Sequence, residues 1–347
     1  MNNYEVIFDT AVRDYLSELS HKGQSSRTVK AYGSAIGYFR KHKSENSGWE
    51  SAPSLTDVRS WRDSLLDKGT SAGTVCYYLG VLRVFFEFAS DIELGEDRYF
   101  ESNPVLKKIF PKTKKSEEQK PYDKILTPED IMKLWANERV HRTDFLWARN
   151  YAIVTLLLDA KIRNAELLDL RLCDIHFASG EGDDIYNYLI VNNGKGNKYR
   201  EVDLTDISVT ALKLYLKSGY RPAELSDDDY LFGTTAEHKF GGKNSGAEEW
   251  HRGTGSWLSA LVERHVRQVT GKSGFRSHSM RHNGAIIELN NGVSAEALQA
   301  ELGHSSVATT QLYSGKLQSK RNRRSMKEVM EVRDEWAEKN KRILEGA

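Results

Sequence analysis

A charged segment in the first half of the chain most constrains how this sequence can fold. Residues 112–121 are mostly lysine and glutamate and contain no large apolar side chain. Such a segment cannot contribute to a hydrophobic core and is typical of a linker between domains. The 347 residues are enough for two domains. We therefore predict an N-terminal domain over residues 1–111, a linker over 112–125, a second domain over 126–325 and a terminal helix over 326–347.

The N-terminal domain is predicted to be entirely helical. Apolar residues recur at the spacing of a helix over residues 8–19 and again over 29–39. Further helices are expected after Thr56 and over residues 72–90, where valine, leucine and phenylalanine are frequent. The pattern gives little sign of a strand in this half of the chain.

The second domain is predicted to be mostly helical with one small hairpin. Thr127 and Pro128 mark the start of its first helix, and residues 148–158 form an apolar run typical of a buried helix. Residues 185–192 and 199–204 are expected to be strands joined by a glycine-rich turn. The fold class is therefore mainly α, with an all-α first domain and an α+β second domain.

Composition excludes several classes of protein and leaves others open. The net charge is +1 and the pI is about 7.7, so any surface for nucleic acid must be local. Cys76 and Cys173 lie far apart, which predicts neither a metal cluster nor a disulfide framework. We find no apolar run long enough for a bilayer and no signal peptide, and we expect a cytoplasmic protein.

Several residues in the second domain have the chemistry needed for phosphoryl transfer. Two guanidiniums bind the oxygens of a phosphodiester in planar, bidentate fashion, and a tyrosine hydroxyl is able to attack the phosphorus. A lysine and histidines supply and accept protons. The candidates are Arg163, Lys195, His278, Arg281, His304 and Tyr313.

Each candidate also has a simpler explanation when taken alone. An arginine at the start of a helix is more often a salt-bridge partner, and a Gly-Lys-Gly sequence is usually only a hairpin turn. A tyrosine near a terminal helix mostly packs against its neighbours. The order of the six residues and the structure predicted around them favour the catalytic interpretation.

The sequence resembles the tyrosine recombinases, the family of phage integrases and Xer proteins, over nearly its whole length. Residues 162–168 resemble the family's arginine box, and 194–200 its lysine hairpin. Residues 277–282 resemble the His-x-x-Arg box, and 302–313 match the final Leu-Gly-His stretch that ends in the tyrosine. In the first half, the stretches beginning at Ser26 and Gly73 resemble helices of the family's SAM-like, core-binding domain.

The resemblance implies a role for each candidate. Arg163 and Arg281 would hold the scissile phosphate, and Tyr313 would form a 3′-phosphotyrosyl link. The remaining implied roles are a general acid at Lys195, an aid to the nucleophile at His278, a phosphate contact at His304 and a supporting carboxylate at Glu166. The family uses no metal and no nucleotide cofactor.

The sequence departs from the family pattern at a few positions. The arginine box usually reads Gly-Leu-Arg, whereas this chain has Lys161, Ile162 and Arg163. Met280 stands where leucine is common. These differences affect the assignment to a subfamily and leave the implied chemistry unchanged.

The resemblance implies a site-specific recombinase that acts on double-stranded DNA. The first predicted helix begins almost at Met1, which favours an Xer-like or simple integrase without an arm-binding domain. Two alternatives remain: a catalytically silent DNA-binding or architectural protein, and a nicking-closing enzyme similar to type IB topoisomerases. Expected phosphate contacts in the first domain, each of which is also explained as a solvated helix face, are Arg27, Lys30, Arg40, Lys41 and Lys43.

The terminal helix over residues 326–347 is predicted to be amphipathic. Val329, Val332 and Trp336 fall on one face of it. In the family that the chain resembles, the equivalent element docks on a neighbouring subunit. The resemblance therefore implies a dimer on one DNA site and a tetramer in synapsis, and it leaves open the need for an accessory protein. The alternative is that the helix folds back onto its own domain.

Overall fold

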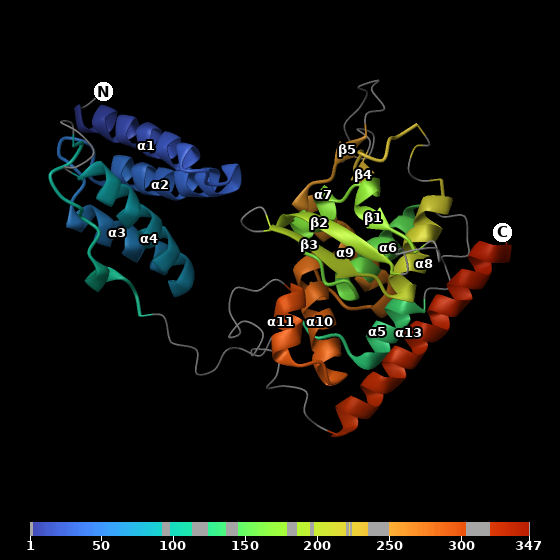
Figure 1. The fold of residues 1–347 in the computed structure, drawn as a ribbon. Helices are drawn as coiled ribbons and strands as arrows, with labels where there is room; N and C mark the ends of the chain where they lie inside the picture. The colour runs from blue at the N-terminus through green and yellow to red at the C-terminus, as the bar shows by residue number, and fades with distance from the viewer. Residues whose placement is uncertain are drawn as a thin grey trace. The chain divides into compact units, whose positions relative to one another are not determined.

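Two compact units, Met1–Pro121 and Tyr122–Ala347, make up the computed structural model (Figure 1). The boundary between them falls inside the predicted linker. The structure describes residues 3–91, 98–112, 124–136, 145–178, 186–194, 198–219, 222, 224–234, 250–302 and 320–346.

Within its described residues the first unit contains helices and no strand, as the sequence predicts. Its helices are α1 (Asn3–His21), α2 (Ser26–Asn46), α3 (Leu55–Asp67), α4 (Ala72–Ala89) and the short η1 (Lys107–Ile109). Serine hydroxyls fix three of the helix starts, because Ser25, Ser54 and Ser71 each accept a hydrogen bond from the backbone N–H three residues later.

Aromatic side chains fill the core of the first unit. The rings of Phe8 and Trp49 lie 4.9 Å apart and those of Phe85 and Phe86 also 4.9 Å apart, all buried. By length and composition α4 is apolar enough to cross a membrane, so our expectation that no such run exists is wrong. The apolar residues of α4 instead form a large part of this core. They include Val75, Leu79, Val81, Leu82, Phe85 and Phe86.

The predicted DNA contacts on α2 differ in how accessible they are. Arg27, Lys30 and Lys41 are exposed. The guanidinium of Arg40 donates to the carboxylate of Asp9 at 2.6 and 2.7 Å. Lys43 is 1% exposed, with its ammonium 3.0 Å from a carboxylate oxygen of Asp57. The prediction for Lys43 is wrong, because its charge is buried in an ion pair and does not reach the surface.

The second unit is mainly helical with small antiparallel sheets, which confirms the predicted fold class. Its helices are α5 (Pro128–Trp135), α6 (Phe145–Leu158), α7 (Asn164–Asp169), η3 (Leu172–Asp174), α8 (Asp206–Lys217), α9 (Gly255–Thr270), α10 (Ser277–Asn290), α11 (Ala295–Leu302) and α13 (Lys320–Gly346). Its strands are β1 (Ile175–His176), β2 (Tyr188–Gly194), β3 (Lys198–Asp203), β4 (Gly233–Thr234) and β5 (His251–Arg252).

The predicted hairpin is present as β2 and β3, with Leu189 opposite Val202. The short strand β1, which the sequence analysis did not predict, pairs with β2 and makes a three-stranded sheet. The apolar run over residues 148–158 forms the buried part of α6, as predicted. This helix packs against α8, α9 and α10, so it anchors the loop that follows it.

The terminal helix α13 lies along its own unit, against α8 and α5 (Figure 1). Val329, Trp336 and Ala337 belong to the core of that unit. The buried amide of Asn340 donates to the hydroxyl of Tyr151 at 3.2 Å. The helix begins at Lys320 rather than at the predicted residue 326. In this single chain the apolar face is therefore buried in cis, the alternative that the sequence left open.

Replacing Trp336 tests whether α13 belongs to the core of its own unit. The side chain is 8% exposed. Trp336→Ala should therefore lower the free energy of unfolding of the second unit by about 3 kcal/mol. Lys327→Ala on the same helix, at a side chain that is 81% exposed, should change it by less than about 0.5 kcal/mol. Equal denaturation midpoints for the two variants would contradict cis packing.

Candidate active site

The site is built around the loop that joins α6 to α7. Lys161 in this loop has φ 52°, the only positive φ at a described residue other than glycine. The turn places Arg163 directly before the first residue of α7. Helix α10 crosses the end of α6 closely: a Cβ at Gly284 would lie 1.9 Å from the carbonyl oxygen of Leu158. This approach brings Arg281 on α10 beside the loop.

Arg163 and Arg281 come together at one backbone carbonyl. The Nη2 of Arg281 donates to the carbonyl oxygen of Leu302 at 2.7 Å, and the Nη2 of Arg163 donates to the same oxygen at 3.1 Å. The Nη1 of Arg281, which is 4% exposed, also donates to the carbonyl of Lys161. Leu302 is the last residue of α11, so its carbonyl lies at the negative end of that helix. Three segments of the chain thus hold two guanidiniums side by side.

Glu166 fixes the first of these arginines. Its side chain accepts hydrogen bonds from the backbone N–H and the guanidinium of Arg163, both at 2.7 Å. The guanidinium of Arg200 on β3 donates to both carboxylate oxygens at 2.8 Å. Burial alone would raise the pKa of Glu166, but the bonds from Arg200 and Arg163 outweigh it and lower the pKa to about 2.

Arg200 also belongs to this cluster, although it was not among the residues predicted from the sequence. It lies on β3, in the stretch that resembles the lysine hairpin, and its charge is directed at Glu166 rather than at solvent. In the sequence, the signal was a cation in a predicted strand close to the candidate Lys195. Only the fold shows which carboxylate it reaches.

His278 lies at the start of α10, one turn before His282. The Nε2 atoms of the two rings are 2.6 Å apart, and the rings meet edge to face. Desolvation, and after it the charge of Arg281, hold the pKa of His278 below its ordinary value. The imidazole is therefore neutral at pH 7 and is able to accept a proton.

The structure places some of the predicted site residues and leaves others outside its description. Arg163, Glu166 and Arg281 are brought together, and His278 stands on the same helix as Arg281. Lys195, His304 and Tyr313 lie outside the described residues. Among the residues that are described, no group of three or more His, Cys, Asp or Glu side chains is arranged to hold a metal ion.

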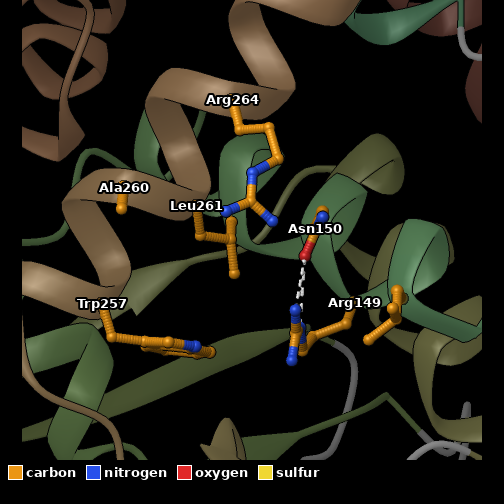
Figure 2. A pocket seen from close by; sticks show the side chains of 7 residues that line it. Arg149, Asn150, Trp257, Ala260, Leu261 and Arg264 are labelled. Atoms are coloured by element: carbon orange, nitrogen blue, oxygen red, sulfur yellow. Dashed lines mark hydrogen bonds between the residues drawn. The ribbon is translucent and has the colours of Figure 1, made fainter. Parts of the chain in front are cut away.

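A separate pocket of about 250 Å³ lies between α6 and α9 (Figure 2). Arg149 and Asn150 line one side of it, and the guanidinium of Arg149 donates to the amide oxygen of Asn150 at 3.0 and 3.2 Å. The indole of Trp257 lies 5.2 Å from that guanidinium, and Arg264 reaches in from α9. None of the predicted catalytic residues lines this pocket.

The chain matches two family models. Residues 124–320 match the phage integrase family, and residues 12–91 match the phage integrase N-terminal SAM-like domain. The first match covers every predicted catalytic residue, and the second covers most of the helical first unit.

Curated relatives are similar over most of their length. Tyrosine recombinase XerC of Oceanobacillus iheyensis is 30% identical over 317 residues, which cover 90% of this chain and 92% of the relative. Tyrosine recombinase XerA of Pyrococcus furiosus is 25% identical over 304 residues, with 87% of this chain and 88% of the relative covered.

Solved structures share the fold. The site-specific recombinase XerH, in a post-cleavage complex with a palindromic difH substrate, aligns with a TM-score of 0.62 at 20% identity. That alignment covers 86% of this chain and 80% of XerH. A lambda integrase dimer bound to a COC′ core site aligns with a TM-score of 0.57 at 16% identity, over 87% of this chain and 96% of the integrase.

The low pKa of Glu166 predicts how stability depends on pH. A carboxyl group whose pKa falls on folding stabilises the fold above its unfolded pKa, near 4.5, and loses that effect as the pH falls toward 2. Glu166→Gln should lower the free energy of unfolding at pH 7 by on the order of 2–3 kcal/mol. At pH 3.5 the difference in free energy of unfolding between this variant and the native protein should be smaller by roughly 1 kcal/mol.

Denaturant unfolding at both pH values measures this difference. Glu129→Gln is the matched control, because its carboxylate pairs with Lys133 on the surface, where the two side chains are 72% and 50% exposed. That variant should stay within about 0.5 kcal/mol of the native protein. A defect in Glu166→Gln that is the same at pH 7 and pH 3.5 would show that the carboxylate charge is not what stabilises the site.

Proposed function

This chain belongs to the phage integrase family of tyrosine recombinases, and we propose that it is a site-specific recombinase that cuts and rejoins DNA through a 3′-phosphotyrosyl intermediate. The observation that carries the proposal is the meeting of Arg163 and Arg281 at the carbonyl of Leu302. Two planar guanidiniums fixed at one point suit the oxygens of a phosphodiester. No observation favours a catalytically silent protein or a topoisomerase.

The two guanidiniums supply most of the catalysis in this proposal. As the phosphodiester is attacked, negative charge develops on its non-bridging oxygens, and donors that are already in place stabilise this charge without reorganising. Glu166, held by Arg200, prevents the Arg163 guanidinium from turning away. The carbonyls of Leu302 and Lys161 do the same for Arg281.

The remaining residues move protons and make the covalent bond. The phenolic oxygen of Tyr313 attacks the phosphorus, and the bond from phosphorus to the 5′ oxygen breaks. His278, neutral at pH 7, accepts the phenolic proton, and Lys195 gives a proton to the leaving 5′ oxygen. His304 donates a hydrogen bond to a phosphate oxygen. Rejoining reverses each of these transfers, so the energy of the broken bond is conserved in the phosphotyrosyl link.

The substrate in this proposal is double-stranded DNA that carries a recombination site, and the compartment is the cytoplasm. The matched structures of XerH and lambda integrase are complexes with DNA. On the first unit, Arg27, Lys30 and Lys41 would contact phosphates, which their exposure supports, whereas Arg40 is paired with Asp9. These contacts position the duplex without reading its sequence.

In this proposal the chain assembles on DNA. The chain acts as a dimer on one site and a tetramer in synapsis, and α13 passes between subunits. The same apolar face that now covers α8 and α5 in cis would then cover the equivalent surface of a neighbour. Such an exchange closes into a ring without a new kind of interface.

Tyr313→Phe tests the nucleophile. The variant keeps the ring and loses the hydroxyl, so it should bind a half-site as the native protein does and form no covalent complex with a nicked substrate. Denaturing gels of trapped adducts measure this. Tyr186→Phe is the control, since that side chain is 68% exposed and should leave the adduct yield unchanged. Persistent covalent adduct in Tyr313→Phe would refute the assignment of the nucleophile.

Helix exchange is tested by cross-linking two different variants. The ammonium of Lys217 lies 3.1 Å from the carbonyl oxygen of Leu344 in one chain. In a background without the native cysteines, Lys217→Cys and Leu344→Cys are made in separate chains and mixed. With a short thiol cross-linker, a linked dimer should form on DNA with full sites and not in the free protein. Recombination that proceeds with no linked dimer would rule out exchange.

A further inference from the structure

Lys161 is unusual in its backbone, its burial and its place in the site. Its φ of 52° lies in the left-handed region, which glycine adopts readily and other residues disfavour. The side chain carries a charge and yet the residue is only 4% exposed. A residue with these features persists where its surroundings compensate for the strain and the burial.

The ammonium of Lys161 is compensated from three directions. It donates to the carbonyl oxygen of Asp159 at 2.6 Å, and it lies 2.8 Å from a carboxylate oxygen of Glu301 on α11 and 3.4 Å from one of Glu288 on α10. The stem of the side chain lies over Gly284, where an added Cβ would stand 2.8 Å from its Cγ. Burial alone would lower the pKa of Lys161, but the two glutamates raise it and keep the group charged.

The backbone of the same residue contacts the arginines of the site. The carbonyl of Lys161 accepts a hydrogen bond from Nη1 of Arg281. The direction of that carbonyl depends on the left-handed conformation of the residue. Glu301, which pairs with the ammonium, directly precedes Leu302, whose carbonyl accepts from both arginines. Lys161 therefore connects the α6–α7 loop to α10, which carries Arg281, and to α11, which ends at the carbonyl that both arginines reach.

We propose that Lys161 is a positioning residue, whose buried ion pairs with Glu288 and Glu301 hold its backbone in the left-handed conformation and so aim its carbonyl at Arg281. The inference rests on the proposed role of Arg281 at the scissile phosphate. A glycine at this position would adopt the same φ without any ion pair to hold it, whereas the lysine needs its ion pairs.

The proposal makes opposite predictions for two substitutions. Lys161→Met keeps the stem over Gly284 and keeps the disfavoured backbone, but it loses the charge that anchors it. Lys161→Gly loses both the stem and the charge, yet it adopts φ 52° without strain. If Lys161 served only to fill space, the glycine variant would be the more damaged, because it removes more atoms.

The experiment measures the rate of covalent adduct formation on a nicked site at saturating DNA, beside the affinity for a half-site. Lys161→Met should cleave about tenfold more slowly, the factor that a left-handed residue without its anchor implies, with half-site affinity unchanged. Lys161→Gly should cleave within about threefold of the native protein. Glu301→Gln leaves the lysine in place and removes its nearer carboxylate, so it should also cleave more slowly than the native protein. It tests the same ion pair if Lys161→Met folds poorly. Lys133→Met, at a surface ion pair, is the matched control.

The results test the positioning role of Lys161 separately from the proposed recombinase function. Cleavage at the native rate by Lys161→Met, or slower cleavage by Lys161→Gly than by Lys161→Met, would overturn the positioning role. Native cleavage by Glu301→Gln would also overturn it, because the anchor would then be dispensable. If the native protein itself forms no adduct, the proposed function fails, and that outcome is distinct from any difference among the variants.

Discussion

The carbonyl oxygen of Leu302 accepts hydrogen bonds from two cations, and the arrangement of the catalytic unit depends on this shared contact. Two unit charges a few ångströms apart repel by on the order of 3–4 kcal/mol at an effective dielectric constant of 20. The negative end of α11 offsets part of that repulsion at the oxygen that both arginines reach. Glu166 adds a full negative charge beside Arg163, and Arg200 then balances that charge from β3.

The fold explains why these groups meet. Helix α6 is buried from Tyr151 to its end at Leu158, so the loop that follows it has a fixed position. The close crossing at Gly284 carries α10, and Arg281 with it, to that loop. The carbonyl of Lys161 and the amide of Asn164, which donates to the hydroxyl of Ser277 at 2.9 Å, then join the loop and the start of α7 to α10. The site is therefore held by the core of the unit.

Much of the fold follows from local patterns in the sequence. The buried part of α6, the capped starts of α2 and α5, and the hairpin of β2 and β3 were predictable because each depends on residues close together in the chain. The short strand β1 was missed, since two residues carry almost no pattern and it exists only through its pairing with β2. A local pattern also cannot show which surface α13 packs against, because an amphipathic face does not specify what buries it.

In the candidate site, too, residues in short motifs were predictable, whereas contacts between distant segments were not. Arg163, Glu166, His278 and Arg281 were named from motifs of a few residues each, and the structure joins Arg163, Glu166 and Arg281. The pairing of Glu166 with Arg200 spans 34 positions and that of Lys161 with Glu301 spans 140, so neither is visible in a motif. Lys43 was assigned to DNA for its charge, and the burial of its ammonium against Asp57 depends on how α2 and α3 pack.

The account's central claim is that the paired guanidiniums stabilise negative charge on the scissile phosphate. The most direct test replaces one non-bridging oxygen of that phosphate by a methyl group, which removes the charge, and compares cleavage of both substrates by the native protein and by Arg281→Ala. Arg281→Ala should be strongly impaired on the phosphodiester and much less impaired on the neutral substrate. An equal loss of cleavage on both substrates would contradict it, because Arg281 would then act through something other than the phosphate charge.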